Sequence, residues 1–161
     1  MSWSKRSFIL SALGLAACGF TPVHGPGGSA QGLRGAIEVA APEDRDTYEL
    51  VKRLDERLAT QTGARYALGY KITVREEGLG VTPEQVIRRV QLRGAVVYTV
   101  TDTVTGEVVD TGSVSTFTSY SAEGSTVSTS AVEDDARRRL MSGLADQIAT
   151  RLMATAADWL A

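Results

Sequence analysis

The sequence has little of the chemistry that supports catalysis or metal binding, because its 161 residues include one cysteine and one histidine. The single cysteine, Cys18, cannot form an internal disulfide, and the single histidine, His24, leaves few ways to build a serine–histidine pair or a metal site. No apolar run approaches the roughly 20 residues that a membrane-spanning helix needs. The sequence therefore argues against a disulfide scaffold, a histidine-based hydrolase and a permanent transmembrane span.

An excess of positive charge is also missing. The 17 lysines and arginines are outnumbered by 19 aspartates and glutamates, so the net charge is −2. A domain that binds nucleic acid normally carries a basic excess or a dense basic stripe, which makes nucleic acid a poor candidate partner. With 43% apolar and 22% charged residues, the composition is that of a globular protein, and the length suits one domain.

The start of the chain has the pattern of an export signal. Lys5 and Arg6 precede an apolar run, and small residues lead into Cys18. The order Leu15-Ala16-Ala17-Cys18 resembles the bacterial lipobox. That resemblance implies that residues 1–17 are removed as a signal peptide and that Cys18 carries a covalent lipid, which anchors the protein to a membrane. The alternative is a buried or incidental cysteine after an ordinary signal peptide.

The residues around Cys18 bear on export and sorting. Gly19 replaces the aspartate that marks inner-membrane retention in the enterobacterial pattern, which favours the outer membrane, on its periplasmic side. Residues 4–10 resemble a weakened twin-arginine export motif whose first arginine is missing. Residues 18–35 are rich in glycine and proline, so we expect a flexible tether there and a single folded domain over residues 36–161. His24, which has no nearby acidic residue, is interpreted as a solvated tether histidine.

Hydrophobic periodicity predicts the order strand, helix, three strands, helix within the folded domain. The predicted elements are a strand at 37–39, a helix over 44–62 ended by Gly63, a strand over 66–75, a turn at 78–83, a strand over 86–103, a hairpin turn at Thr105-Gly106, a strand over 108–120, a polar loop over 121–130 and a helix over 134–160. The simplest arrangement that buries their apolar faces is an α+β fold with two helices on one face of a roughly four-stranded, mostly antiparallel sheet.

The same patterns predict which side chains form the core. The residues expected to point inward are Tyr48, Val51, Leu54 and Leu58 in the first helix, Tyr66, Leu68, Tyr70, Ile72, Val74, Val90, Leu92, Val96, Tyr98 and Val100 in the strands, and Ala136, Leu140, Leu144, Ile148, Leu152 and Ala156 in the last helix. The opposite sheet face then carries Lys71, Arg75, Arg89 and Arg93 among serines and threonines. An ordinary solvated face is the alternative interpretation of these four cations.

No catalytic arrangement emerges from the rest of the sequence. The serines between 113 and 130 lack a nucleophile elbow, and the glycines lack P-loop spacing. Glu133-Asp134-Asp135 lies at the predicted start of the last helix, where acidic groups suit the helix dipole better than they suit a metal ion. Arg137-Arg138-Arg139 spreads around the helix as a solvated face or a partner contact. We therefore expect neither an enzyme nor a metal site.

Two stretches of sequence are similar to a known family. One is Cys18-Gly19-Phe20-Thr21-Pro22-Val23-His24-Gly25 after the lipobox; the other is the final helix, with Asp134-Asp135-Ala136-Arg137-Arg138-Arg139-Leu140 and Leu144-Ala145-Asp146-Gln147-Ile148. With the strand and helix pattern between them, they resemble the alphaproteobacterial LptE family of lipopolysaccharide-assembly lipoproteins. The resemblance implies a non-enzymatic outer-membrane protein that plugs the LptD β-barrel, helps it assemble and binds lipopolysaccharide. It needs no cofactor beyond the lipid on Cys18.

The candidate lipopolysaccharide-binding residues are Lys71, Arg75, Arg89 and Arg93, which come from the strand pattern alone. Guanidinium and ammonium groups on one sheet face suit the phosphates of lipid A. An alternative of another class is an auxiliary lipoprotein of an ABC-type phospholipid transport system. A structural envelope lipoprotein would carry the same anchor and tether, whereas an envelope enzyme would need a nucleophile and a base that the sequence does not display.

Overall fold

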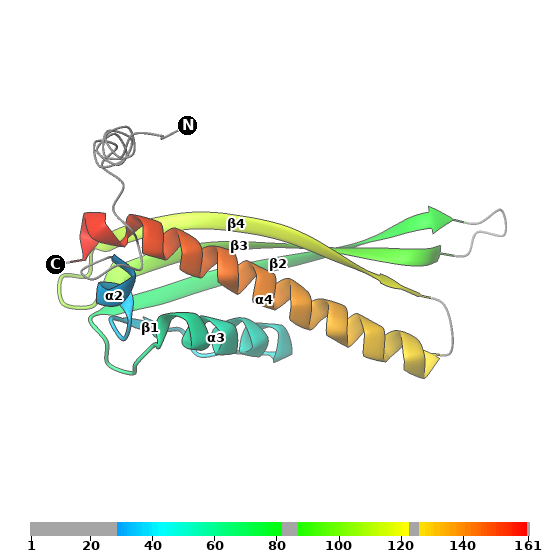
Figure 1. Ribbon diagram of the computed structural model, residues 1–161, viewed down its shortest axis with the longest axis horizontal. Coiled ribbons are helices and arrows are strands. Elements are labelled where there is room, and N and C mark those ends of the chain that lie inside the picture. The colour runs from blue at the N-terminus through cyan, green and yellow to red at the C-terminus, as the bar shows by residue number, and fades with distance from the viewer. Residues whose placement is uncertain (1–28, 82–86, 123–125, 161) are drawn as a thin grey trace, which may run out of the picture.

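The computed structural model describes residues 29–81, 87–122 and 126–160. The predicted signal peptide, Cys18, His24 and residues 18–28 of the predicted tether lie outside the described residues. The described chain forms one sheet with helices packed on it (Figure 1). In chain order the elements are α2 (Ser29–Leu33), β1 (Ile37–Val39), α3 (Arg45–Leu58), β2 (Tyr66–Val81), β3 (Ile87–Asp102), β4 (Val108–Ser121) and α4 (Thr126–Trp159).

The sheet has four strands in the order β1-β2-β3-β4. β1 runs parallel to β2, whereas β2, β3 and β4 are joined antiparallel as a long meander. α3 and α4 lie side by side on one face, and α4 runs along most of the length of the sheet (Figure 1). The predicted α+β class, the roughly four-stranded, mostly antiparallel sheet and the position of the helices on one face are therefore confirmed.

Alternation along the strands produces the core as predicted. In β3, Leu92, Val96, Tyr98 and Val100 are buried, while the odd-numbered residues between them face away from the helices. The stripe on α4 is also buried along its whole length, through Ala136, Leu140, Leu144, Ile148, Leu152 and Ala156. In α3 the prediction was partly wrong: Leu50, Leu54 and Leu58 are buried, but Tyr48 is 56% exposed. The helix is rotated so that Leu50, not Tyr48, occupies the first core position.

The ends of α3 are set by local hydrogen bonds. The Thr47 N–H donates to the Asp44 carboxylate (2.7 Å) and the Asp44 N–H donates to Thr47 Oγ1 (2.8 Å), so the two residues form a capping box. The Thr47 N–H is also the main reason why the pKa of Asp44 lies below its ordinary value. At the other end Ala59 adopts a left-handed conformation with φ of 50°. The helix therefore stops at Leu58, before the predicted end at residue 62.

Three other boundaries differ from the prediction. β2 continues to Val81, opposite Ile87, so the turn predicted at 78–83 is wrong over residues 78–81. α4 begins at Thr126, so the second half of the predicted polar loop is helical. In the segment predicted as tether, residues 29–33 form α2, and Leu33 is completely buried. Each difference follows from tertiary pairing or burial that overrides local composition.

The β3–β4 turn agrees with the prediction at Thr105-Gly106, where Gly106 has a φ of 74°. The Asp102 carboxylate stabilises this turn by accepting hydrogen bonds from the N–H groups of Val104 (2.8 Å) and Thr105 (3.3 Å), and it also pairs with Arg65 (3.0 Å). The Val104 N–H is the main cause of the lowered pKa of Asp102. The end of the β3–β4 hairpin is thus held by a buried carboxylate.

Gly94 allows α4 to lie directly on the sheet. It sits on the helix-covered face of β3, and a β-carbon there would lie 2.8 Å from Leu144 Cδ1 and 3.1 Å from Leu140 Cδ2. Gly112, one strand away, makes room for the Tyr98 ring, because a β-carbon there would lie 2.5 Å from the Tyr98 hydroxyl oxygen. A larger residue at either position forces the helix or the ring away from the sheet.

We expect Gly94→Val to lower the free energy of unfolding by about 1–3 kcal/mol, because the added methyl groups overpack the contact with Leu140 and Leu144. Gly69→Val is the matched control, since Gly69 lies on the open face of β2 and a β-carbon there would come no closer than 4.0 Å to its nearest neighbour, the Thr99 carbonyl oxygen. Urea denaturation of both variants measures the difference. Equal losses for the two variants would contradict this role of Gly94.

Candidate functional site

The four predicted cations lie on the sheet face that the helices leave open, which we call the outer face. Arg75 is directly opposite Arg93, Lys71 is opposite Val97, and Arg89 is opposite Leu79 in the β2–β3 register. All four side chains are exposed. The register therefore arranges them as a row along the sheet, with one cation at each end and two in the middle. Each end of the row lies about 13 Å from its middle, because Lys71 is four residues from Arg75 along β2 and Arg89 is four residues from Arg93 along β3.

A hollow of about 480 Å³ opens in the middle of the outer face. Arg75, Arg93 and Phe117 provide its large side chains, and Phe117 pairs with Arg93 across the β3–β4 register. The remaining lining residues are small or contribute backbone: Thr73, Gly94, Ala95, Ser115 and Thr116. The structure thus brings Arg75 and Arg93 together at one hollow and leaves Lys71 and Arg89 flanking it.

The four cations differ in how far their charge is already neutralised. Arg93 donates to Gln91 Oε1 (3.1 Å) and lies 3.5 Å from the Glu77 carboxylate. Arg89 donates to Ser119 Oγ (3.1 Å), and this neutral acceptor does not neutralise the charge of Arg89. Among the residues that the structure describes, neither Arg75 nor Lys71 has an ion-pair partner. Arg75 therefore presents a guanidinium group that an anion at the hollow can bind directly.

Two apolar residues of the outer face were not singled out from the sequence. Phe117 is 65% exposed and Val97 is 55% exposed. The signal for Phe117 was available, because Val114 faces inward and every odd-numbered neighbour in β4 must then face outward. The outer face consequently offers apolar contact beside the cations, which is the combination that an amphiphilic anion requires.

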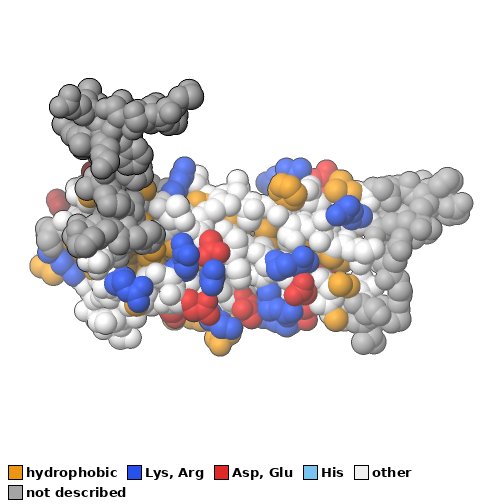
Figure 2. Space-filling model, in the orientation of Figure 1, with side chains coloured by type: hydrophobic (Ala, Val, Ile, Leu, Met, Phe, Trp, Pro, Cys, Tyr) orange, Lys and Arg blue, Asp and Glu red, His pale blue; other side chains and the backbone are white. Residues whose placement is uncertain are grey.

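The acidic and basic runs of the last helix have a different role from the predicted one. α4 begins at Thr126, so Glu133, Asp134 and Asp135 lie inside the helix and not at its start. Asp134 pairs with Arg45 of α3 (2.8 Å), and Asp135 pairs with Arg138 and Arg139 within α4. Lys/Arg and Asp/Glu side chains are intermingled over α3 and α4 in Figure 2. The helix-dipole explanation of these carboxylates is therefore wrong.

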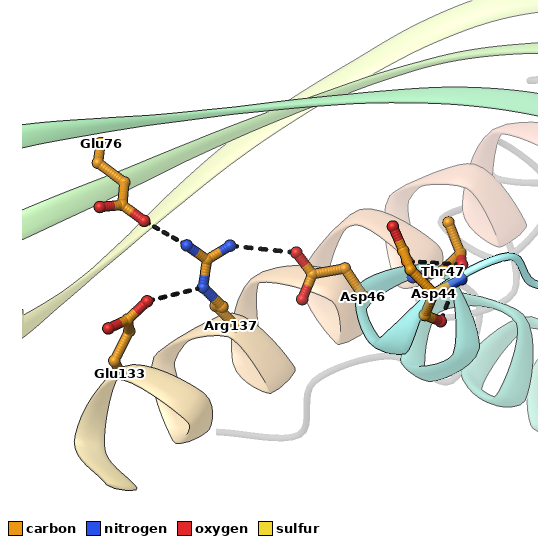
Figure 3. A network of polar contacts seen from close by, with 6 residues as sticks. All are labelled: Asp44, Asp46, Thr47, Glu76, Glu133 and Arg137. Carbon is orange, nitrogen blue, oxygen red and sulfur yellow. Dashed lines mark hydrogen bonds and ion pairs between the residues drawn. The ribbon is translucent and has the colours of Figure 1, made fainter. Parts of the chain in front are cut away.

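Arg137 joins three elements (Figure 3). Its guanidinium contacts Glu76 of β2, Asp46 of α3 (3.2 Å) and Glu133 of α4 (3.0 Å). Its side chain is 28% exposed. Partial burial opposes the charge, but hydrogen bonding by Glu133 and the charges of Asp46 and Glu76 more than offset it, so the pKa of Arg137 is raised. Unlike Arg138 and Arg139, Arg137 is therefore neither a solvated side chain nor a free partner contact.

Among the described residues, no group of three or more metal-ligating side chains is placed to hold a metal ion, and no helix is both long and apolar enough to cross a membrane. The three carboxylates around Arg137 all contact its guanidinium group. The hollow on the outer face is the described feature that brings two of the predicted cations, Arg75 and Arg93, together.

Replacement of Arg137 by methionine is expected to lower the free energy of unfolding by about 1–3 kcal/mol, because it leaves three carboxylates facing one another without their shared cation. Arg138→Met removes the same charge from a partly exposed position whose partner lies within the same helix, so its cost should stay below about 0.5 kcal/mol. Thermal unfolding at neutral pH compares them. A loss for Arg137→Met no larger than that for Arg138→Met would show that the junction contributes nothing.

Comparison with known proteins gives a family and a fold. A family model described as LptE, lipopolysaccharide-assembly, matches residues 35–152. A lipoprotein of solved structure from Caulobacter crescentus CB15 is 26% identical, with a TM-score of 0.67 over 83% of this chain and 98% of that chain. Rare lipoprotein B from Shewanella oneidensis is 12% identical, with a TM-score of 0.58 over 76% and 96% of the two chains.

A minor lipoprotein from Acinetobacter baumannii is 22% identical, with a TM-score of 0.54 over 74% of this chain and 89% of that chain. These last two likenesses show the fold. A search of curated proteins found no match.

Proposed function

The chain belongs to the LptE lipopolysaccharide-assembly family, and from this premise we propose that it binds lipopolysaccharide on the outer face of its sheet while it plugs an LptD-type β-barrel in the outer membrane. In this proposal the protein is not an enzyme. Its role is to hold an amphiphilic anion during delivery to the outer leaflet and to support assembly of the barrel.

The hollow between Arg75, Arg93 and Phe117 is the observation that supports lipid binding most directly. A guanidinium group donates two parallel hydrogen bonds to a phosphate, and such charge-assisted bonds are stronger than neutral ones. Arg75 has no described ion-pair partner, so it need not break a contact to bind. Phe117 and Val97, both more than half exposed, provide apolar surface for the first methylenes of an acyl chain. Lys71 and Arg89 extend the cationic row to either side.

Other features support the proposed lipid anchor and the proposed binding to a β-barrel. The lipobox ending at Cys18 supports acylation and attachment to the periplasmic side of the outer membrane. β4 presents Thr111, Ser113, Ser115 and Ser119 on the outer face, and a surface of this kind suits the water-filled interior of a large outer-membrane barrel. Both features are compatible with a domain that sits inside a barrel and faces a polar wall.

We expect the double variant Arg75→Ser/Arg93→Ser to weaken lipopolysaccharide binding by roughly one to two orders of magnitude, because it removes the charge-assisted bonds to phosphate. The fold should persist, since the two arginines face each other and like charges directly opposite are unfavourable. Arg138→Ser/Arg139→Ser, which removes the same net charge from the helix side, is the control. Affinity is measured by titration with lipopolysaccharide in detergent. Equal affinities for the two double variants would show that lipopolysaccharide does not bind at the hollow.

The barrel partner is tested by purification from outer membranes. A C-terminally tagged chain, extracted in detergent, should bring down a large β-barrel in a one-to-one ratio, with the identities of the chains determined by mass spectrometry. Recovery with inner-membrane permease subunits would instead support the phospholipid-transport alternative. If the tagged chain is recovered without any partner, the proposal that it plugs a barrel is overturned, and a lipid-binding or structural lipoprotein is left.

A further inference from the structure

β4 forms an open edge of the sheet. It is the last strand in the sheet order, and no described strand pairs with its second edge. The strand has 14 residues, of which Asp110 is the one charged residue, and it contains no proline. Open edges of this length normally carry charged side chains or proline, because these block the addition of another strand. β4 lacks both kinds of protection over its central part.

The backbone groups of β4 that face this edge can be identified. Arg151 of α4 donates to the Ser113 carbonyl oxygen (2.6 Å), and the Thr111 hydroxyl donates to the Tyr98 carbonyl oxygen (3.1 Å), which places that carbonyl on the β4 side of β3. Tyr98 pairs with Gly112, so the even-numbered residues of β4 bond to β3. The N–H and C=O groups of Ser113, Ser115, Phe117 and Ser119 consequently point away from the sheet.

The opposite edge of the sheet, which β2 forms, is protected against the addition of another strand. β1 covers residues 66–68 of β2. Beyond it, the exposed part of β2 carries Lys71, Arg75, Glu76 and Glu77, and Tyr70 reaches across to the Ala41 carbonyl oxygen (3.3 Å). The chain therefore blocks the β2 edge with a paired strand and with charged residues of β2 itself, whereas at the centre of the β4 edge the charged side chain is Arg151, which comes from α4.

A groove of about 520 Å³ runs beside the centre of β4. Its lining residues are Ser113, Val114 and Ser115 of β4 and Asp146, Gln147, Thr150 and Arg151 of α4. A single extended strand presents only alternate side chains on one side, and these fit such a volume.

We propose that the open edge of β4 binds an extended polypeptide segment of a partner protein of the cell envelope, which adds to the sheet as a fifth strand. A row of outward N–H and C=O groups is complementary to another polypeptide backbone and to little else. The polar groove selects small or polar side chains on the added strand, and the strand displaces Arg151 from the Ser113 carbonyl. The inference takes the envelope location from the proposed function, but it does not require the partner to be a barrel.

Ser113→Pro tests the pairing, because it removes an outward N–H and places a ring at the edge while the β3–β4 ladder is retained. Ser113→Ala keeps the N–H and is the matched control. Each tagged full-length variant is purified from membranes, and the ratio of partner to tagged chain is measured together with the melting temperature. We expect Ser113→Pro to lower this ratio about tenfold at little cost in stability, and Ser113→Ala to leave it unchanged.

Amide hydrogen exchange on the unaltered complex provides a second measurement that does not depend on any variant. The amides of Ser115 and Phe117 should exchange more slowly in the complex than in the chain alone. Exchange at equal rates, an unchanged ratio for Ser113→Pro, an equal loss for Ser113→Ala or the absence of any partner would each overturn the proposal. If Ser113→Pro still retains a β-barrel, strand addition at β4 is contradicted but the proposed plugging of a barrel is supported. If instead the partner is not a barrel and Ser113→Pro loses it, strand addition is supported and the plugging of a barrel is contradicted.

Discussion

Leu140 and Leu144 of α4 pack onto Gly94 of β3 at a distance that leaves no room for a β-carbon. This contact places a 34-residue helix, about 50 Å long, flat against the sheet. Most of the apolar core then lies between α4 and the strands, with α3 beside α4. The described helices pack on one face, so within the described part of the chain the other face of the sheet and the second edge of β4 are open.

The charged side chains are also distributed differently on the helix side and on the outer face of the sheet. On the helix side, arginines are matched with carboxylates from other elements: Arg137 with Asp46 and Glu76, and Arg53 with Asp146 at 3.0 Å. On the outer face, Arg75 and Lys71 have no described ion-pair partner. A net charge of −2 is compatible with binding an anion, because Arg75 and Lys71 present positive charge on the outer face, where Glu77 lies beside Arg93 at 3.5 Å.

The sequence alone predicts what depends on periodicity and misses what depends on distant contacts. Alternation predicted the inward residues of β3 and the common face of Arg75 and Arg93, because strand geometry alone determines both. The role of Arg137 was not accessible, since its partners Glu76 and Asp46 are 61 and 91 residues away in the chain. The early start of α4 and the burial of Leu33 were missed for the same reason: serines, threonines and glycines favour loops unless tertiary packing stabilises a helix.

The outer face and the β4 edge are not independent surfaces. Phe117 directs its side chain to the hollow and its backbone groups to the open edge, and Ser115 does the same. A strand that pairs with β4 would fix the backbone of both residues, and a ligand in the hollow would fix their side chains. If each event restricts the same segment, the second loses less entropy than it would alone, so ligand and partner would bind with positive coupling. By reciprocity, the partner would strengthen ligand binding by the same factor by which the ligand strengthens attachment of the partner.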